Sequence, residues 1–367
     1  MKKIRHVLGI SGGKDSAALA IYIRDKYPQL DIEYYTCDTG KELDETYQLI
    51  KNLEIYLGKK IQILRAVENS NESPFDHYIK RKGGFIPSSN ARWCTKALKL
   101  EPFEKFVGND PVVSYVGIRG DEEREGYISR KPNIQSIFPF RKNIWSEDVI
   151  AKVLSNNNSE QVLELFHSLA ITKNKDRFQE VLKQSITQFF TLHQKLNLLL
   201  DLGTKEFNSM VFSFLKTTPY PLSSEESYPL INNEDILVRD DIFRILRESG
   251  VGVPEYYNKI GFETEGKEGF YSRSRSGCYF CFYQQKIEWV WLLEQHPDLF
   301  EKAKEYEKSG YTWNQNESLS QLANPERVKK IKEEYYNRTN KVVKNTSPLL
   351  LDILAEAEGE GCASCFI

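Results

Sequence analysis

Six consecutive residues near the amino terminus combine the residue types that bind phosphate: Ser11-Gly12-Gly13-Lys14-Asp15-Ser16. The two glycines let a backbone approach an anion closely, the lysine adds a positive charge, and the serine hydroxyls add donors. An apolar run precedes them and an alanine-rich helical pattern follows, so the order is strand, turn, helix. A helix that begins at such a turn points its free N–H groups at an anion bound in the turn. We expect a nucleotide phosphate chain there; an ordinary glycine-rich turn is the alternative.

Further polar residues follow two segments that predict strands, residues 31–37 and 112–117. Asp38 follows the first segment, and Arg119 and Arg124 follow the second. Parallel sheets bind ligands at the carboxyl ends of their strands, so these residues are expected to face one pocket with the turn. The planar guanidinium group of arginine binds phosphates through two parallel hydrogen bonds, and an aspartate can bind a Mg²⁺-bound phosphate or a ribose hydroxyl. The alternative for Asp38 is an ordinary turn aspartate, and the alternative for the two arginines is a charged surface loop with internal ion pairs.

Five cysteines form a second group of candidates: Cys94, the Cys278-x-x-Cys281 pair, and the Cys362-x-x-Cys365 pair of the tail. Cys94 opens a predicted helix, where a thiol pKa is expected to be lowered. Each pair brings two thiolates onto one metal atom or cluster, with a redox dithiol or buried thiols as alternatives. The tail pair could complete a four-thiolate site, carry sulfur, or belong to a disordered tail.

The elements that must position these residues alternate along the first 150 residues. Strands expected at 7–10, 31–37, 61–64 and 112–117 are separated by helical patterns such as residues 42–57. This alternation predicts an α/β fold, a parallel twisted sheet with helices on both faces.

We expect three parts: residues 1–150 as the nucleotide-binding α/β domain, 151–233 as an inserted helical subdomain with its returning loop, and 234–367 as a helical C-terminal region carrying the cysteine site. Residues 286–308 predict one helix of that last part.

Composition limits the classes of function. The 367 residues carry a net charge of −2, so any nucleic-acid contact must come from local patches such as residues 80–82. Apolar runs stay well short of the ~20 residues of a membrane span, so we expect a cytoplasmic protein with no membrane partner. In that compartment, cysteines indicate metal or redox chemistry rather than disulfides.

The turn at residues 11–16 resembles the SGGxDS signature of the PP-loop ATP pyrophosphatases, which split ATP between its α and β phosphates. The DTG after residue 37, the GIRGDEER segment at 117–124 and the FPF…W…DV segment at 138–149 are similar to motifs of the phosphoadenylylsulfate (PAPS) reductase branch. The segment at 117–124 departs slightly from the family motif, because it has two glutamates where the family has Glu-Ser. The resemblance implies ATP binding by Ser11, Gly12, Gly13, Lys14, Asp15, Ser16, Asp38, Gly117, Arg119 and Arg124.

The spacing of Cys94, Cys278 and Cys281 resembles the iron–sulfur ligand set of adenylylsulfate reductases, although Trp93 replaces one cysteine of that set. The RWCT segment at 92–95, the SGCxxC segment and the insertion before it most resemble the DNA phosphorothioation enzymes of the Dnd and Ssp systems (DndC and SspD types). These enzymes replace a non-bridging phosphate oxygen of DNA with sulfur.

This resemblance implies a set of roles and partners. Lys14, Asp38, Arg119 and Cys94 would be catalytic, with Cys94, Cys278, Cys281, Cys362 and Cys365 as metal ligands. The cofactors would be ATP, Mg²⁺ and either a [4Fe-4S] cluster or Zn²⁺, since four thiolates suit both. The partners would be DNA, a cysteine desulfurase and other proteins of a phosphorothioation complex. A PAPS or adenylylsulfate reductase and a nucleotide-sensing scaffold are the alternatives. The hypothesis requires an open turn that faces Asp38 and Arg119.

Overall fold

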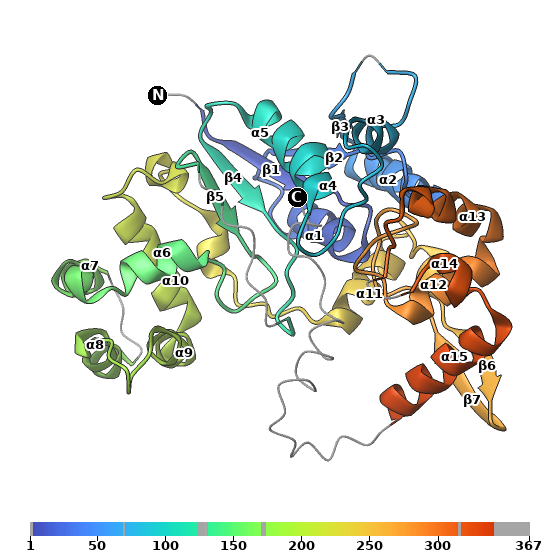
Figure 1. Ribbon diagram of the computed structural model, residues 1–367. Coiled ribbons are helices and arrows are strands. Elements are labelled where there is room, and N and C mark those ends of the chain that lie inside the picture. Colours follow the sequence, from blue (N-terminus) through green and yellow to red (C-terminus); the bar gives the residue numbers. More distant parts are fainter. Residues whose placement is uncertain are drawn as a thin grey trace.

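The computed structural model describes residues 3–68, 70–122, 129, 131–169, 174–314 and 317–340. Five parallel strands form its central sheet in the order β3-β2-β1-β4-β5 (Figure 1). The strands are β1 (Arg5–Gly9), β2 (Ile32–Cys37), β3 (Ile61–Leu64), β4 (Val112–Tyr115) and β5 (Ile134–Ile137). The predicted α/β fold class is confirmed. Strand β5 was not predicted from the sequence, because it is only four residues long and half polar.

The strand order reverses direction between β1 and β4. The chain leaves β1 toward β2 and β3 on one side, and returns to place β4 and β5 on the other. In open parallel sheets, ligands bind where the order reverses, because the loops after the two neighbouring strands diverge there. The loops after β1 and β4 are therefore the two that the topology singles out.

Helices cover both faces of the sheet. Alternate side chains of a strand point to opposite faces, so neighbours Val7 and Leu8 of β1 belong to different hydrophobic clusters. Leu8 packs in the cluster of α1 (Lys14–Lys26) and α2 (Asp44–Leu57), and Val7 packs in the cluster of α5 (Glu101–Val107). Between β3 and α5 the chain forms α3 (Pro74–Arg81), α4 (Trp93–Thr95) and the π-helical turn η1 (Lys96–Leu100).

A helical group follows β5 and lies beside the sheet in Figure 1. It contains α6 (Glu147–Val153), α7 (Ser159–Ser168), α8 (Lys175–Lys183), α9 (Leu192–Leu202) and α10 (Thr204–Leu215), with short 3₁₀ turns η2 (Asn156–Asn158), η3 (Pro221–Ser224) and η4 (Pro229–Asn232). Its buried side chains share one hydrophobic cluster with the sheet face under α1. The helices thus extend the core of the sheet.

The C-terminal part begins with α11 (Arg239–Glu248), which packs against α1. It continues through the 3₁₀ turns η5 (Glu255–Tyr257) and η6 (Tyr306–Ser309), the antiparallel hairpin β6 (Ile260–Thr264) and β7 (Lys267–Tyr271), and four helices, α12 (Lys286–Gln295), α13 (Pro297–Glu305), α14 (Leu319–Leu322) and α15 (Pro325–Asn340). The hairpin corrects the expectation of a purely helical region. Its two turn residues, Glu265 and Gly266, have φ values of 47° and 72°, as a two-residue hairpin turn requires.

The expected single helix over 286–308 is wrong, because Pro297 begins a second helix after His296. In the part of the chain that the structure describes, no helix combines the length and the apolar character needed to cross a bilayer.

Candidate nucleotide and sulfur site

The predicted phosphate turn joins β1 to α1 in the way the sequence indicates. Gly12 has a φ of 73°, which a side chain would strain. The Ser11 N–H donates to Ser16 Oγ (3.1 Å), and the Ser16 hydroxyl donates to the Gly13 carbonyl (3.2 Å). The turn is thus closed on itself by the serines expected to donate to phosphate.

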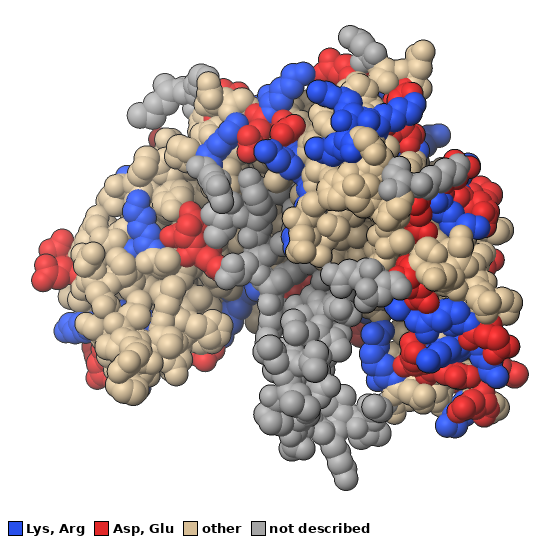
Figure 2. Space-filling model, in the orientation of Figure 1, with Lys and Arg blue, Asp and Glu red and all other residues tan. Residues whose placement is uncertain are grey.

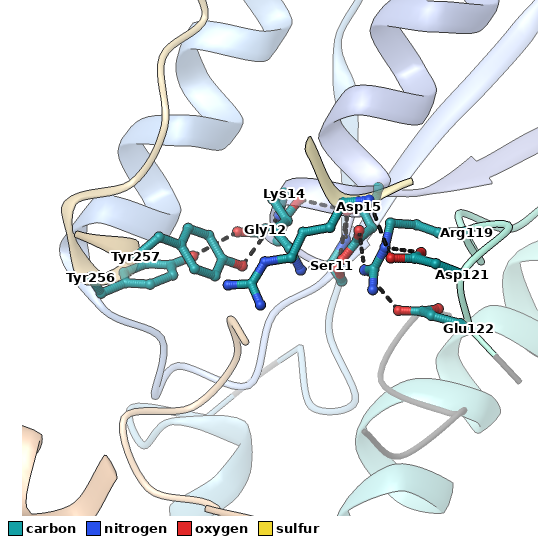
Figure 3. Close-up of polar contacts among 12 residues, drawn as sticks. Ser11, Gly12, Lys14, Asp15, Arg119, Asp121, Glu122, Tyr256 and Tyr257 are labelled. Carbon is teal, nitrogen blue, oxygen red and sulfur yellow. Dashed lines mark hydrogen bonds and ion pairs between the residues drawn. The ribbon is translucent and has the colours of Figure 1, made fainter. Parts of the chain in front are cut away.

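A buried charge network lies at the start of α1 (Figure 3). Lys14 Nζ donates to Asp15 Oδ2 (2.8 Å), and Arg119 Nη1 donates to Asp15 Oδ1 (2.8 Å). Burial alone would raise the pKa of Asp15, but the two cations outweigh it and hold the pKa below its ordinary value. Burial lowers the pKa of Lys14, and Asp15 opposes part of that change. The network fixes both cations beside the turn.

Arg119 lies among three carboxylates. Besides Asp15 it pairs with Asp121 through Nε (2.8 Å) and with Glu122 through Nη1 (2.7 Å). The loop is anchored where the Gly120 N–H donates to the Leu237 carbonyl (2.9 Å). These pairs match the ion-paired alternative considered for the segment, so a phosphate at Arg119 would have to replace a carboxylate.

Two other residues were predicted in this segment, Gly117 and Arg124. A Cβ on Gly117 would lie 2.9 Å from the Asp15 carbonyl oxygen, so only a glycine lets β4 come this close to the turn. Arg124 lies outside the described residues.

Asp38 follows β2 as predicted, and other groups contact both of its carboxylate oxygens. Oδ1 accepts from the Gly40 N–H (2.8 Å) and the Tyr47 hydroxyl (3.0 Å). Oδ2 accepts from Arg65 Nε (3.0 Å). This is the turn-aspartate arrangement with an added ion pair, and its role toward Mg²⁺ or ribose stays a prediction.

A cavity of about 190 Å³ opens beside the turn, at the carboxyl end of β2. Ser11, Asp38 and Glu42 line its polar side, while Cys37 and Ile50 add apolar surface. Arg119 is not among the residues that the structure places around it. The turn therefore contacts Arg119 through Asp15, whereas it shares a cavity with Asp38.

The C-terminal part covers the turn, which the sequence analysis missed. The Tyr257 hydroxyl accepts from the Lys14 N–H (3.3 Å), and the Tyr256 hydroxyl donates to the Gly12 carbonyl (3.1 Å). A Cβ on Gly13 would lie 2.5 Å from Ser276 Oγ. The expectation of an open turn is therefore wrong in this structure, because three side chains from more than 240 residues away contact the turn. An unremarkable Pro-Glu-Tyr-Tyr segment gave no signal of this role.

The Cys278 segment pairs with the loop after β2. Glu42 and Cys278 form an isolated antiparallel bridge, and the Tyr279 N–H donates to the Lys41 carbonyl (2.8 Å). Thr39 Oγ1 lies 3.2 Å from Cys278 Sγ and donates to Glu42 Oε1 (2.6 Å). Because Gly277 also lines the cavity beside Ser11, the CxxC segment and the phosphate turn border one space.

Two of these thiols, Cys94 and Cys278, have pKa values raised above that of a free thiol. Burial, aided by Cys281, raises the pKa of Cys94 to about 11, against the expected lowering. Cys94 does lie in the first turn of a continuous helical run from Trp93 to Val107, so the reason is the burial of its thiol. Burial also raises the pKa of Cys278, and Glu42 adds to that change.

The described residues do not fit a metal centre by themselves. Within them, no group of three or more His, Cys, Asp or Glu side chains is arranged to hold a metal ion. Cys362 and Cys365 lie outside the described residues. The zinc or iron–sulfur site therefore stays a prediction, and nothing below depends on it.

The comparisons agree with the fold and the turn. Residues 5–162 match the family model of the phosphoadenosine phosphosulfate reductase domain. This stretch holds the whole sheet, the turn and the Arg119 loop. The first part of the chain is thus similar to that domain over the sheet, the turn and the Arg119 loop.

Two curated relatives come from Methanocaldococcus jannaschii, and both are named only as uncharacterized proteins. MJ0066 is 35% identical over 153 residues, which cover 38% of this chain and 30% of that protein. MJ0973 is 26% identical over 168 residues, which cover 41% of this chain and 38% of that protein. The chain thus spans well under half the length of these relatives. No solved structure matches.

Proposed function

We propose that this chain is an ATP pyrophosphatase that activates a DNA backbone phosphate for sulfur incorporation. The observation that carries the proposal is the shared cavity. It is bordered by Ser11 of the phosphate turn and by Gly277, next to the Cys278 thiol. A nucleotide held at the turn would therefore border the CxxC segment, as a reaction that couples adenylation to sulfur chemistry requires.

The reaction would run in two displacements. A non-bridging oxygen of a DNA phosphodiester attacks the α-phosphorus of ATP, forming an adenylated phosphate and releasing pyrophosphate. A sulfur nucleophile, supplied upstream by a cysteine desulfurase, then attacks the DNA phosphorus and expels AMP. In this scheme the Lys14 and Arg119 cations stabilise the charge that develops on the phosphates, once these replace carboxylates as their partners.

The test is product analysis with the full chain, labelled ATP and DNA. We expect AMP and pyrophosphate, and ADP with inorganic phosphate would contradict the proposal. Lys14→Ala should abolish turnover. Lys183→Ala on α8 is the matched control, since it removes an exposed lysine from another part of the fold.

A second candidate is a sulfonucleotide reductase. The matched family model favours it, because its description names PAPS reductase. In that case the purified protein with a thioredoxin-like reductant would release sulfite from PAPS, and DNA would not affect the rate. Sulfite release without DNA-dependent pyrophosphate formation would replace the first proposal with this one.

A further inference from the structure

A second, larger hollow of about 500 Å³ lies between α3, α5 and the loop after β3. Ala66, Val67 and Pro102 give it an apolar floor, and the rings of His77 and Tyr78 line it as well. The hollow is open to solvent rather than enclosed, and it therefore suits a polymer segment lying across the surface.

Cations dominate the rim of this hollow, which we call the α3–α5 groove. Its lining includes Arg65, Arg81 and Lys105, with Glu68 and Glu101 as the acidic members. Lys82 and Lys96, which follow α3 and begin η1, are also exposed, whereas Lys80 pairs with Glu72 at another hollow. Figure 2 shows Lys and Arg side chains, in blue, gathered over β3 and α3 at the top of the view.

The rim cations are available to a ligand. Arg81 is exposed and has no hydrogen bond or ion pair with any residue that the structure describes. Lys105 pairs with Glu68 at 3.2 Å, but both side chains are at least 70% exposed, so this pair contributes little and is easily exchanged. An incoming phosphate could thus bind both cations without breaking a buried contact.

Arg65 connects this groove to the nucleotide cavity. It lines both spaces, and its guanidinium pairs with Asp38 at the end of β2 (Nη2 to Oδ2, 2.9 Å). A chain of phosphates following the groove toward Arg65 would therefore reach the edge of the cavity beside Ser11. An isolated basic patch elsewhere on the surface would not deliver a substrate to that point.

We infer that the α3–α5 groove binds the backbone of a DNA strand and leads one of its phosphates toward the nucleotide cavity. The inference rests on the proposed function for the choice of DNA, and on the groove itself for the place. Arg81 and Lys105 bind backbone phosphates, and the half-buried Tyr78 and His77 side chains line the groove beside them.

The test measures DNA binding alone, without ATP. Fluorescence anisotropy of a fluorescein-labelled DNA strand is followed against salt concentration for the wild type and for the Arg81→Ala/Lys105→Ala double variant. We expect affinity to fall at least about tenfold at 0.1 M salt, and the salt slope to fall by about two, one for each lost phosphate contact. Thermal unfolding of the variant should match the wild type, because both side chains are exposed.

The control is Lys183→Ala, which should leave binding unchanged. Equal DNA affinity of the double variant and the wild type would overturn the inference, as would tighter binding of an acidic peptide that competes for the groove. Pyrophosphate release is scored separately. DNA binding that depends on the groove without that release would leave the groove standing and remove the proposed function. If pyrophosphate is released but the double variant binds DNA as tightly as the wild type does, the proposed function stands and the groove inference is overturned.

Discussion

Asp15 neutralises two cations that the fold places at the start of α1. Its side chain and that of Lys14 are 5% and 7% exposed, so little water compensates the charges. We expect Asp15→Asn to lower the free energy of unfolding by about 3–5 kcal/mol, because Lys14 is left buried without a counter-charge. Urea unfolding would measure this. Asp31→Asn, which removes a surface pair with Lys59, should change it by less than about 1 kcal/mol.

The same residue gives a pH dependence with a defined sign. The folded pKa of Asp15 is lowered, so its contribution to stability is complete above the ordinary value of 3.8. That contribution is lost as the pH falls from 3.8 through the lowered folded pKa. The Asn variant should therefore lose less stability than the wild type over this acidic range, and a parallel loss in both would contradict the assignment.

At the residue scale, the sequence predicted which groups surround the turn, but not their present partners. Lys14, Asp15, Arg119 and Asp38 all lie at the predicted strand ends. Residue types cannot show whether Arg119 pairs with a phosphate or with Asp121, because both are anions within its reach. The expectation of a lowered pKa for Cys94 was wrong for a similar reason, because the burial that raises this pKa depends on the whole fold.

At the scale of elements, α9 supports the end of α8 through one buried lysine. Lys195 is 2% exposed and donates to the carbonyls of Leu182 (2.8 Å) and Gln184 (2.7 Å), which a helix end leaves without partners. We expect Lys195→Met to lower the free energy of unfolding by about 1–3 kcal/mol, because both carbonyls lose their donor. Chemical denaturation would check this.

The control for that variant is Lys175→Met at the start of α8, an exposed position in the same helical group. It should change stability by less than about 0.5 kcal/mol. Equal effects of the two substitutions would show that the Lys195 donors do not support α8.

Elements with a clear period were predictable, and elements decided by packing were not. The strands β1 to β4 and the helix α2 follow from apolar patterns that local chemistry determines. Strand β5 carries Gln135 and Ser136 between two isoleucines and becomes a strand only because β4 offers an edge. The β6–β7 hairpin depends on the Glu265-Gly266 turn, which is a weaker signal than Asn-Gly.

At the scale of the whole molecule, the turn and the C-terminal part should respond to ATP together. Tyr256, Tyr257 and Ser276 contact the turn, so a nucleotide that reorganises it must also disturb or tighten them. Hydrogen exchange followed by mass spectrometry is the measurement. We expect ATP to change protection both in residues 9–16 and in residues 254–281, with α9 and α10 unaffected.

A change confined to residues 9–16 would show that the covering segment is a passive neighbour. The contact between the turn and residues 254–281 could not be predicted from the sequence, because no local pattern indicates which distant segment packs on a given loop.

The separation between the turn and its cover also has a consequence during translation. The Gly12 carbonyl meets its tyrosine 244 positions later in the chain. At roughly 5–20 residues per second, a ribosome needs roughly 12–50 s to make that interval. During that interval the glycine turn has been synthesised but lacks the tyrosine and serine side chains that cover it in the complete fold.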